Sequence, residues 1–426
     1  MNTIASVRKN HSFIKLQKLI IASLLIGFLA AFLAVSLKRM TEHYESVLFH
    51  EAGVHPIYFV VFPFLGLAVI YFLRLYLFRN KENKGIKEIF ESTQSKSKNL
   101  PIYKIPLHFI NGFLTVIFGG STGIEVSTVV ASATIGSVAQ QKENVFRQYK
   151  SELICAGVAA GITALFSSPV AGILFAFEVI SKKTTRTFFL TTILAVSIAS
   201  GLIFILHEKP LFAMDITVWH FHAIPYFILL GILAGLYAVY LTKCVLFFKS
   251  QFGRIDKHFY KIVLGVMVIG ISLLLLPQLY GDGYHAVRTI LHAPNVIPLT
   301  IPFAITLIGV IFLKPVITSV TLASGGDGGI FAPSLFAGAF LGLLTALVLN
   351  TFFDADVIPV NFMVIGMAAL LSASIHAPFT AVFLVCAIIN DYTLFFPIAV
   401  ICLISKYTAK AIYPFTVYTY SPGTSK

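Results

Sequence analysis

Two glycine-rich segments, GGSTGIE at 119–125 and GGDGGIF at 325–331, contain the residues best suited to binding chemistry. Each is followed by small and apolar residues that predict the start of a helix. Glycines let the backbone turn and approach a ligand closely, and the free N–H groups of a starting helix carry about half an elementary charge. Both segments can therefore bind an anion through the backbone. The alternative is that the glycines only let helices pack closely, as small residues do in membranes.

Glu125 ends the first of these segments. An ionisable side chain at membrane depth is costly, so it is a functional candidate by default. At a helix N-terminus a carboxylate is attracted by the same N–H groups as an anion. Glu125 is therefore expected to compete with an anion while charged and to move aside once protonated. The alternative is a helix-capping acid, because Glu is favoured in the first turn of a helix.

No cofactor or metal site is predicted. Neither glycine segment continues into the Gly-Lys-Ser/Thr of a phosphate-binding loop, and no H-E-x-x-H pair occurs. The four cysteines lie in apolar runs without metal-ligand spacing. An intramembrane enzyme that uses Glu125 and Asp327 as general acid and base is one alternative. It is disfavoured because no paired carboxylates with a nucleophile or metal cluster accompany them.

The chain that positions these segments is strongly apolar. Of its 426 residues, 57% are hydrophobic and 12% are charged, against about 25% charged residues in soluble domains. Mean hydropathy is +0.88. Several apolar runs reach the roughly 20 residues of a spanning helix, and others are shorter or broken by Gly and Pro. We predict an all-α integral membrane protein with one domain over 1–426, whose first membrane helix follows the basic residues of 1–18.

The formal charge of +13 comes from Lys and Arg concentrated in the connectors, including 79–99. The positive-inside rule places such connectors on the cytoplasmic side. Nucleic-acid binding is the less favoured alternative, because the basic residues are not interleaved with aromatic residues on one soluble face. The expected surroundings are the lipid bilayer of a cell membrane, with no nucleic acid as partner.

An internal repeat relates the two halves of the chain. GVAAGITALFSSP from Gly157 and GMAALLSASIHAP from Gly366 match at an offset of 209, and GIE and GIF in the glycine segments match at an offset of 206. These landmarks predict a first repeat at 17–206 and a second at 219–420. Repeats in membrane proteins are often inverted, with half-helices that point their N-termini at a ligand between them.

These motifs resemble the CLC family of chloride channels and chloride/proton antiporters. GGIFAP at 328–333 is the anion motif of the family's second half, and SSPVAGILFAFE at 167–178 resembles a helix of its first half. GIEVS at 123–127 keeps the Gly and Glu of the family's Gly-(Lys/Arg)-Glu-Gly-Pro motif and replaces the other three residues. The resemblance covers roughly 17–420. It implies two inverted repeats of tilted and re-entrant helices, and a homodimer with one pore per subunit.

The resemblance also implies roles for particular residues. The backbone N–H groups of Ile330 and Phe331 would bind chloride or a similar small anion, and Glu125 would be the gate. A C-terminal tyrosine would donate its hydroxyl to the same anion. Three tyrosines lie in YPFTVYTYS, and the spacing favours Tyr418. The alternative for Tyr418 is an interfacial belt residue.

The family's first anion motif, Gly-Ser-Gly-Ile-Pro in most members, is matched best by NKGIKEI at 83–89. Gly85 and Ile86 fit this motif, and Lys84 takes the place of its Ser. A lysine beside the pathway would attract anions, but its charge would be costly to bury. The alternative is that Lys84 is one of several cytoplasmic loop cations.

Val179 stands where exchanging members of the family commonly have a second Glu that relays protons, and a valine cannot carry a proton. We therefore expect a passive chloride channel gated by protonation of Glu125. The alternative is a chloride/proton antiporter of the same fold with an unusual proton path. Glu178, one residue earlier, is expected to pair with Lys182 or Lys183. The short stretch after residue 420, without the regulatory domains of many eukaryotic members, suggests a prokaryotic protein and a bacterial inner membrane.

Overall fold

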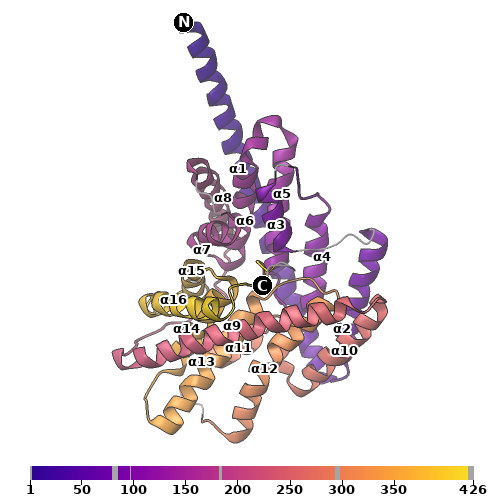
Figure 1. Ribbon diagram of the computed structural model, residues 1–426, viewed down its shortest axis with the longest axis vertical. Coiled ribbons are helices and arrows are strands. Elements are labelled where there is room, and N and C mark those ends of the chain that lie inside the picture. The colour runs from indigo at the N-terminus through magenta and orange to yellow at the C-terminus, as the bar shows by residue number, and fades with distance from the viewer. Residues whose placement is uncertain (1, 79–84, 96, 182–184, 293–297, 421–426) are drawn as a thin grey trace. The chain divides into compact units, whose positions relative to one another are not determined.

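The computed structural model describes residues 2–78, 85–95, 97–181, 185–292 and 298–420 (Figure 1). Every regular element among these residues is a helix, and one isolated β-bridge joins Gly123 to Gly329. The predicted all-α class is therefore confirmed.

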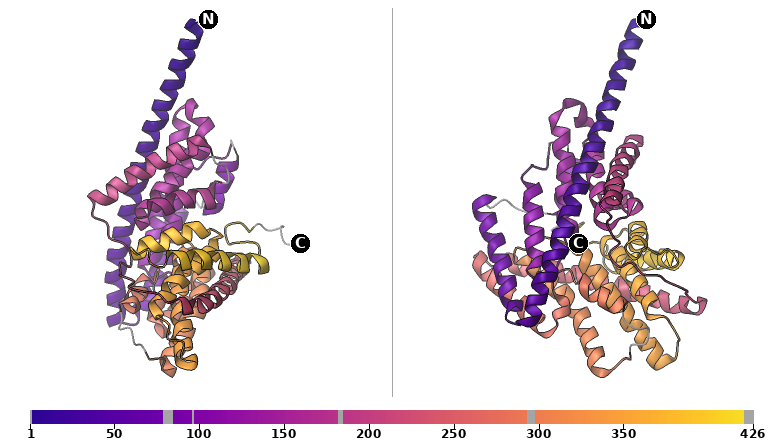
Figure 2. Two further views of the ribbon diagram at one scale, coloured as in Figure 1. Left: turned by 90° about the vertical axis from the view of Figure 1, so that its left-hand side faces the viewer. Right: turned by 180° about the vertical axis from the view of Figure 1, so that it is seen from behind.

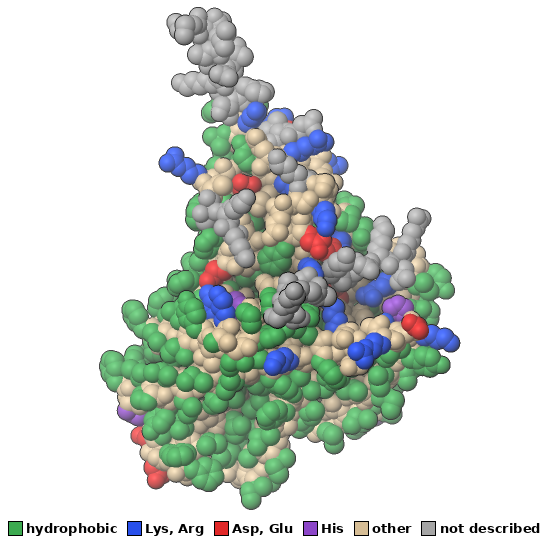
Figure 3. All heavy atoms as spheres, in the orientation of Figure 1, with side chains coloured by type: hydrophobic (Ala, Val, Ile, Leu, Met, Phe, Trp, Pro, Cys, Tyr) green, Lys and Arg blue, Asp and Glu red, His purple; other side chains and the backbone are tan. Residues whose placement is uncertain are grey.

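Nine helices in the described part of the chain are long and apolar enough to span a membrane, by length and composition. They are Phe13–Val54, Tyr58–Leu77, Phe146–Phe166, Arg186–Ile205, Phe221–Gly253, His258–Leu275, Ile301–Ala323, Phe331–Phe353 and Phe395–Ile412. Shorter apolar helices lie at Lys104–Ile117, Pro169–Ile180, Pro359–Ile375 and Pro378–Ile389. Many large apolar side chains are exposed, which a soluble protein avoids but a lipid-surrounded one does not (Figure 3).

The chain forms two compact units. The first comprises Met1–Ser36, Lys84–Leu107 and Thr128–Lys209, and the second comprises Leu37–Asn83, His108–Ser127 and Pro210–Lys426. Three helices contribute residues to both units: α1 (Asn2–Val54), α4 (Lys104–Ile117) and α5 (Glu125–Lys142). The first of them, α1, is one continuous helix of 53 residues (Figure 2).

The remaining helices each lie in one unit. Those of the first unit are α3 (Ile86–Gln94), η2 (Asn144–Tyr149), α6 (Lys150–Phe166), α7 (Pro169–Phe175), η3 (Ala176–Ile180) and α8 (Arg186–Ile205). Those of the second unit are α2 (Tyr58–Phe72), η1 (Leu73–Leu77), η4 (Phe221–Ala223), α9 (Ile224–Gly253), α10 (His258–Leu275), η5 (Pro277–Leu279), α11 (Tyr284–Leu291), α12 (Ile301–Ala323), α13 (Phe331–Phe353), α14 (Pro359–Ile375), α15 (Pro378–Ile389) and α16 (Phe395–Ile412).

Small residues bring the helices of the first unit close together. Its core is rich in alanine from α1, α6 and α8. A Cβ added to Gly27 of α1 would lie 2.5 Å from the carbonyl oxygen of Ala195 in α8, and one added to Gly136 of α5 would lie 2.2 Å from that of Leu153 in α6. Close backbone contact of this kind is how helices associate where lipid removes the hydrophobic driving force.

The second unit is built around α13 and α14, which are buried along most of their length. A Cβ added to Gly342 of α13 would lie 2.0 Å from the carbonyl oxygen of Phe362 in α14. Hydroxyl groups then join α14 to α16: Ser372 Oγ donates to the carbonyl of Cys402 at 2.7 Å. This bond gives a buried hydroxyl of α14 a partner on the neighbouring helix.

The helix pairs α5–α6 and α13–α14 make matching contacts. Gly157 of α6 faces the carbonyl oxygen of Ser132, and Gly366 of α14 faces that of Gly338; the added Cβ would lie 2.3 Å and 2.2 Å away. These residues are related by the offsets of 206 and 209 that the sequence shows. Duplicated packing therefore accompanies the duplicated motifs.

The ends of α6 and α14 also match. Ser167 and His376 end them in the left-handed region, with φ of 54° and 57°, and Pro169 and Pro378 begin the next helices. Proline is favoured at the first helical position because its missing N–H has no partner there. The predicted boundaries of the two repeats, 17–206 and 219–420, stay predictions.

Candidate anion site

The two glycine segments lie side by side in the second unit. Loop 118–124 leads from α4 into α5, and loop 324–330 leads from α12 into α13. An antiparallel β-bridge joins Gly123 to Gly329, which are equivalent residues of the repeat. Gly119 and Gly325, also equivalent, have φ of +81° and +111°, which only glycine adopts without strain. The repeat thus produces two loops of the same shape, paired through their equivalent residues.

Each loop is held by a threonine of the other half. Thr321 Oγ1 accepts the N–H of Ser121 at 3.2 Å, and Thr115 Oγ1 accepts the N–H of Asp327 at 2.9 Å. All four residues are related pairwise by the offset of 206. The bridge and the two hydrogen bonds join equivalent residues, so the two loops are related by a local twofold axis. Because the loops are paired in this way, the starts of α5 and α13 lie close together.

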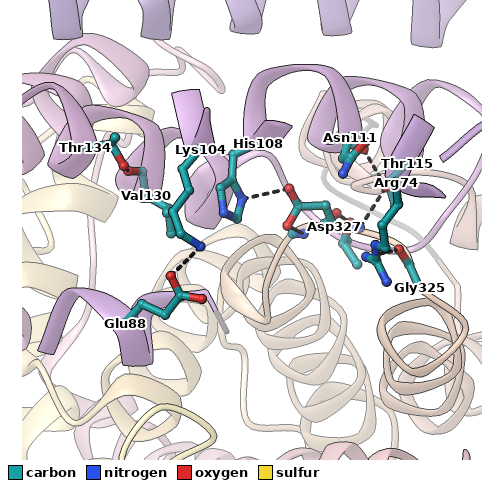
Figure 4. Close-up of polar contacts among 12 residues, drawn as sticks. Arg74, Glu88, Lys104, His108, Asn111, Thr115, Val130, Thr134, Gly325 and Asp327 are labelled. Atoms are coloured by element: carbon teal, nitrogen blue, oxygen red, sulfur yellow. Dashed lines mark hydrogen bonds and ion pairs between the residues drawn. The ribbon is translucent and has the colours of Figure 1, made fainter. Parts of the chain in front are cut away.

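Asp327 has its polar atoms engaged in holding its loop (Figure 4). Its Oδ2 lies 2.8 Å from Nδ1 of His108, and both side chains are buried. Its Oδ1 accepts the N–H of Gly328, and its N–H donates to Thr115. These contacts give Asp327 a structural part. Ser121 also fits a Gly-x-Ser-x-Gly spacing, but it follows a helix instead of the strand that a nucleophile elbow requires.

Glu125 lies at this junction with its side chain 2% exposed. Its Oε1 accepts a hydrogen bond from the hydroxyl of Tyr284 at 2.6 Å. Its carboxylate folds back over Gly123, where an added Cβ would lie 1.8 Å from Oε2 and 2.6 Å from the Cβ of Ala332. The N–H of Ala332, in the first turn of α13, stabilises the carboxylate electrostatically, although Oε2 makes no well-formed hydrogen bond with any described residue. Glu125 thus begins one helix and lies at the start of the other.

Three other predicted residues lie at the start of α13. Ile330 is the N-cap residue and Phe331 the first helical residue, and both are buried. No side-chain hydrogen bond caps this helix at Ile330. Tyr418 is half-buried, and its buried hydroxyl lies 3.0 Å from the position of a Cβ on Gly329. The structure therefore places Ile330, Phe331 and Tyr418 together with Glu125, while their roles in anion binding stay predictions.

The predicted first anion motif belongs to the other unit. Gly85, with φ of +58°, is the N-cap residue of α3, and buried Ile86 begins that helix. Lys84 lies outside the described residues. The part of these three residues in anion binding stays a prediction.

Val179 lies buried in the short helix η3. The described structure offers no test of the proton-relay position that the sequence interpretation assigned to it. The predicted partners of Glu178, Lys182 and Lys183, lie outside the described residues.

The sequence interpretation overlooked Tyr284 and a buried lysine. Lys314 of α12 is fully buried; its Nζ donates to the carbonyls of Gly281 at 3.1 Å and Asp282 at 3.2 Å. It also lies 4.4 Å from the centre of the Phe336 ring in α13, at cation–π distance. A lysine within the apolar run GVIFLKPVITSV was a visible signal, because a charge at membrane depth is rare.

A cavity of about 90 Å³ lies behind Tyr284. It is lined by acids from α1 and the loop before α11, including Glu42, Glu45 and Asp282, and by Arg288. Glu45 Oε1 accepts the N–H of Asp282 at 3.2 Å. Burial and the neighbouring Glu125 charge raise the pKa of Asp282 to about 7, against the lowering effect of the bond from the Tyr284 N–H. Asp282 therefore changes its charge near neutral pH.

Comparison with known proteins gives consistent matches. A sequence model described as voltage gated chloride channel matches residues 65–410. The chain is 28% identical over 405 residues to the H(+)/Cl(-) exchange transporter ClcA of Vibrio parahaemolyticus, covering 90% of this chain and 84% of that protein. It is 27% identical over 353 residues to the putative chloride channel protein ClcB-like of Ralstonia nicotianae, covering 79% and 78%.

Solved structures show the same fold. A slow cyanobacterial Cl-/H+ antiporter superposes with a TM-score of 0.81 at 22% identity, covering 94% of this chain and 96% of that one. A CLC-type fluoride/proton antiporter superposes with a TM-score of 0.78 at 22% identity, covering 95% and 97%. Together with the nine apolar helices of the described residues, the bacterial relatives confirm the predicted multi-pass protein of the bacterial inner membrane.

Proposed function

Because this chain belongs to the voltage-gated chloride channel family, we propose that it exchanges chloride for protons. Glu125 would carry the proton, and its carboxylate and chloride would occupy the same place in turn. We thus prefer the antiporter, which the sequence left as the alternative, to the passive channel expected from Val179. A relative that covers 90% of the chain is named an H(+)/Cl(-) exchange transporter, which supports this choice.

The observation that carries the proposal is the position of the Glu125 carboxylate at the start of α13. A charged carboxylate there takes the place that an anion would take beside the helix N-terminus. A protonated side chain loses most of that attraction and leaves the place to the anion. One place is therefore used alternately by a proton-carrying group and by chloride, and this alternation couples their movements.

Other residues of the site hold the anion or set the local charge. The N–H groups of Ile330 and Phe331 and the hydroxyl of Tyr418 are the donors we assign to the anion. In its protonated form, Lys314 offsets part of the negative charge of the acids Glu45, Asp282 and Glu125. A buried charge acts at short range with little screening by salt. The anion therefore meets donors together with carboxylates that Lys314 partly compensates.

A passive channel is the second candidate, and Val179 is the observation that favours it. Without an acid at position 179, protons would reach Glu125 from one side only and would open the path without being transported. The relative from Ralstonia nicotianae carries a channel name. In either case we propose a homodimer with one pore per subunit, as the family resemblance implies.

Liposomes that contain the purified protein separate the two candidates. With the membrane potential held at zero by potassium and valinomycin, an inward chloride gradient is expected to drive protons out of the liposomes, against an opposing pH gradient. A pH electrode records the movement, and protein-free liposomes are the control. Chloride flux without proton movement would establish the channel instead.

A further inference from the structure

We propose that Tyr284 is the latch of the gate: its hydroxyl holds the charged Glu125 carboxylate over the anion site. The inference rests on the proposed function of Glu125 and adds a positioning residue to it. Tyr284 lies 159 residues from Glu125 in the chain, on the short helix α11.

The contact is a single hydrogen bond between two buried side chains. The Tyr284 hydroxyl lies 2.6 Å from Oε1 of Glu125, the length typical of a hydroxyl donating to a charged carboxylate. Such bonds are roughly twice as strong as those between neutral groups. A protonated carboxyl group accepts far less strongly, so the bond favours the charged, blocking form of Glu125.

Tyr284 is held in place by contacts with its surroundings. Its N–H donates to Oδ1 of Asp282 at 2.8 Å, and its ring packs edge-on against Phe212 at 5.4 Å. Gly283 before it has φ of +84°, and a Cβ there would lie 2.4 Å from the Phe336 ring of α13. The loop is thus pressed against α13, with the hydroxyl aimed at the site.

The groups that face Glu125 determine what the latch can do. They are Tyr284 and Asp282 at the start of α11, Lys314 from α12 and Tyr418 from the C-terminal segment. Burial raises the pKa of Tyr284 well above its usual value, so its hydroxyl keeps its proton at neutral pH. Tyr284 therefore acts as a donor and never as a proton carrier. Protonation of Glu125 releases the latch.

The cavity that Tyr284 lines, of about 90 Å³, has room for water molecules. Tyr284, Asp282 and Glu45 all line it. A latch between the cavity and the anion site keeps Glu125 on the site side while the carboxylate is charged. Loss of the hydroxyl should therefore make the gate easier to release, so that less acid is needed.

The test is chloride flux from liposomes as a function of pH. Tyr284→Phe is expected to move the pH of half-maximal flux upward by about one unit, a tenfold change in proton concentration, because one charge-assisted bond to the carboxylate is lost. Tyr280→Phe is the matched control: this buried tyrosine of the same loop donates to the carbonyl of Ile117 at 2.7 Å and not to Glu125. It should keep the wild-type pH.

Two further measurements keep the outcome decisive. In Glu125→Gln, adding Tyr284→Phe should change the pH profile no further, because the bonded carboxylate is already gone. If Tyr284→Phe does not fold, 3-fluorotyrosine at position 284 replaces it; its stronger donor should move the pH of half-maximal flux downward. An unmoved profile in Tyr284→Phe, or in the fluorotyrosine protein, overturns the latch while leaving the gate intact. A wild-type profile in Glu125→Gln overturns the gate itself.

Discussion

Liposomes that contain the Glu125→Gln variant are expected to release chloride at a rate that no longer depends on protonation of residue 125. The variant should also move no protons. Glutamine has nearly the same shape but cannot take up or lose a proton, and its neutral amide is held only weakly by the N–H groups at the start of α13. Wild-type flux should rise as pH falls, up to about tenfold per pH unit above the midpoint of the gate, because the protonated fraction rises in that way. The variant should lose this rise and run near the maximal rate.

A weaker pH dependence should remain in Glu125→Gln, with a midpoint below pH 7. Burial and the Glu125 charge raise the pKa of Asp282 to about 7 in the wild-type protein, and the variant lacks the Glu125 charge. A negative Asp282 beside the site repels an arriving anion, so flux should fall as pH rises through this lower pKa. Adding Asp282→Asn should remove this remainder, while the amide oxygen can still accept the N–H of Tyr284.

Chloride-electrode recordings between pH 5 and about 8 check both expectations. Glu152→Gln is the control, because Glu152 is likewise an acid in the first turn of its helix, α6, and contacts Thr185 instead of a glycine loop. It should behave as wild type. A full wild-type pH profile in Glu125→Gln would show that another group is the gate, and Lys84 would be the next candidate.

Gly342→Ala is expected to stop α13 from packing against α14. The added Cβ would lie 2.0 Å from the carbonyl oxygen of Phe362 and 2.5 Å from its carbonyl carbon. Backbone atoms of a neighbouring helix cannot rotate away as a side chain can, so the helices must separate. Overpacking of this kind costs about 3 kcal/mol or more, which is roughly a hundredfold loss in the ratio of folded to unfolded protein. Gly136→Ala, its repeat equivalent, should behave alike.

The measurement is the fraction of protein that stays monodisperse in detergent after heating. Gly201→Ala in α8 provides the control, because a Cβ there meets nothing within 4 Å. Alanine in a helix interior is favoured over glycine by about 0.5–1 kcal/mol, so this variant should be as heat-stable as wild type or better. Equal heat stability of the Gly342 and Gly201 variants would show that the close α13–α14 contact is not needed.

The parts of the site that follow from local chain chemistry could be predicted from the sequence. Gly119 and Gly325 need positive φ, and a glycine loop followed by small residues predicts a helix start. The repeat predicted that these loops would be equivalent, and they pair through Gly123 and Gly329. Glu125 was recognisable because burying an acid at membrane depth costs free energy, so such an acid is a functional candidate by default.

The partners of Glu125 could not be predicted in this way. Tyr284 lies on a helix of eight residues after a tight turn, and nothing in its spacing points to a residue 159 positions away. Lys314 was visible as a charge, but its partners are mainly backbone carbonyls, which leave no trace in the sequence. Contacts of this type depend on how distant helices pack, and local periodicity carries no information about that packing.

The most direct measurement locates bromide in crystals of Glu125→Gln by its anomalous X-ray scattering. We propose that the wild-type carboxylate takes the place of an anion, so the variant is expected to hold bromide beside the N–H of Ala332, at the start of α13. The wild-type protein at neutral pH should hold none at that position. Bromide bound elsewhere in the variant, with none beside Ala332, would contradict the claim that Glu125 and the transported anion use the same place.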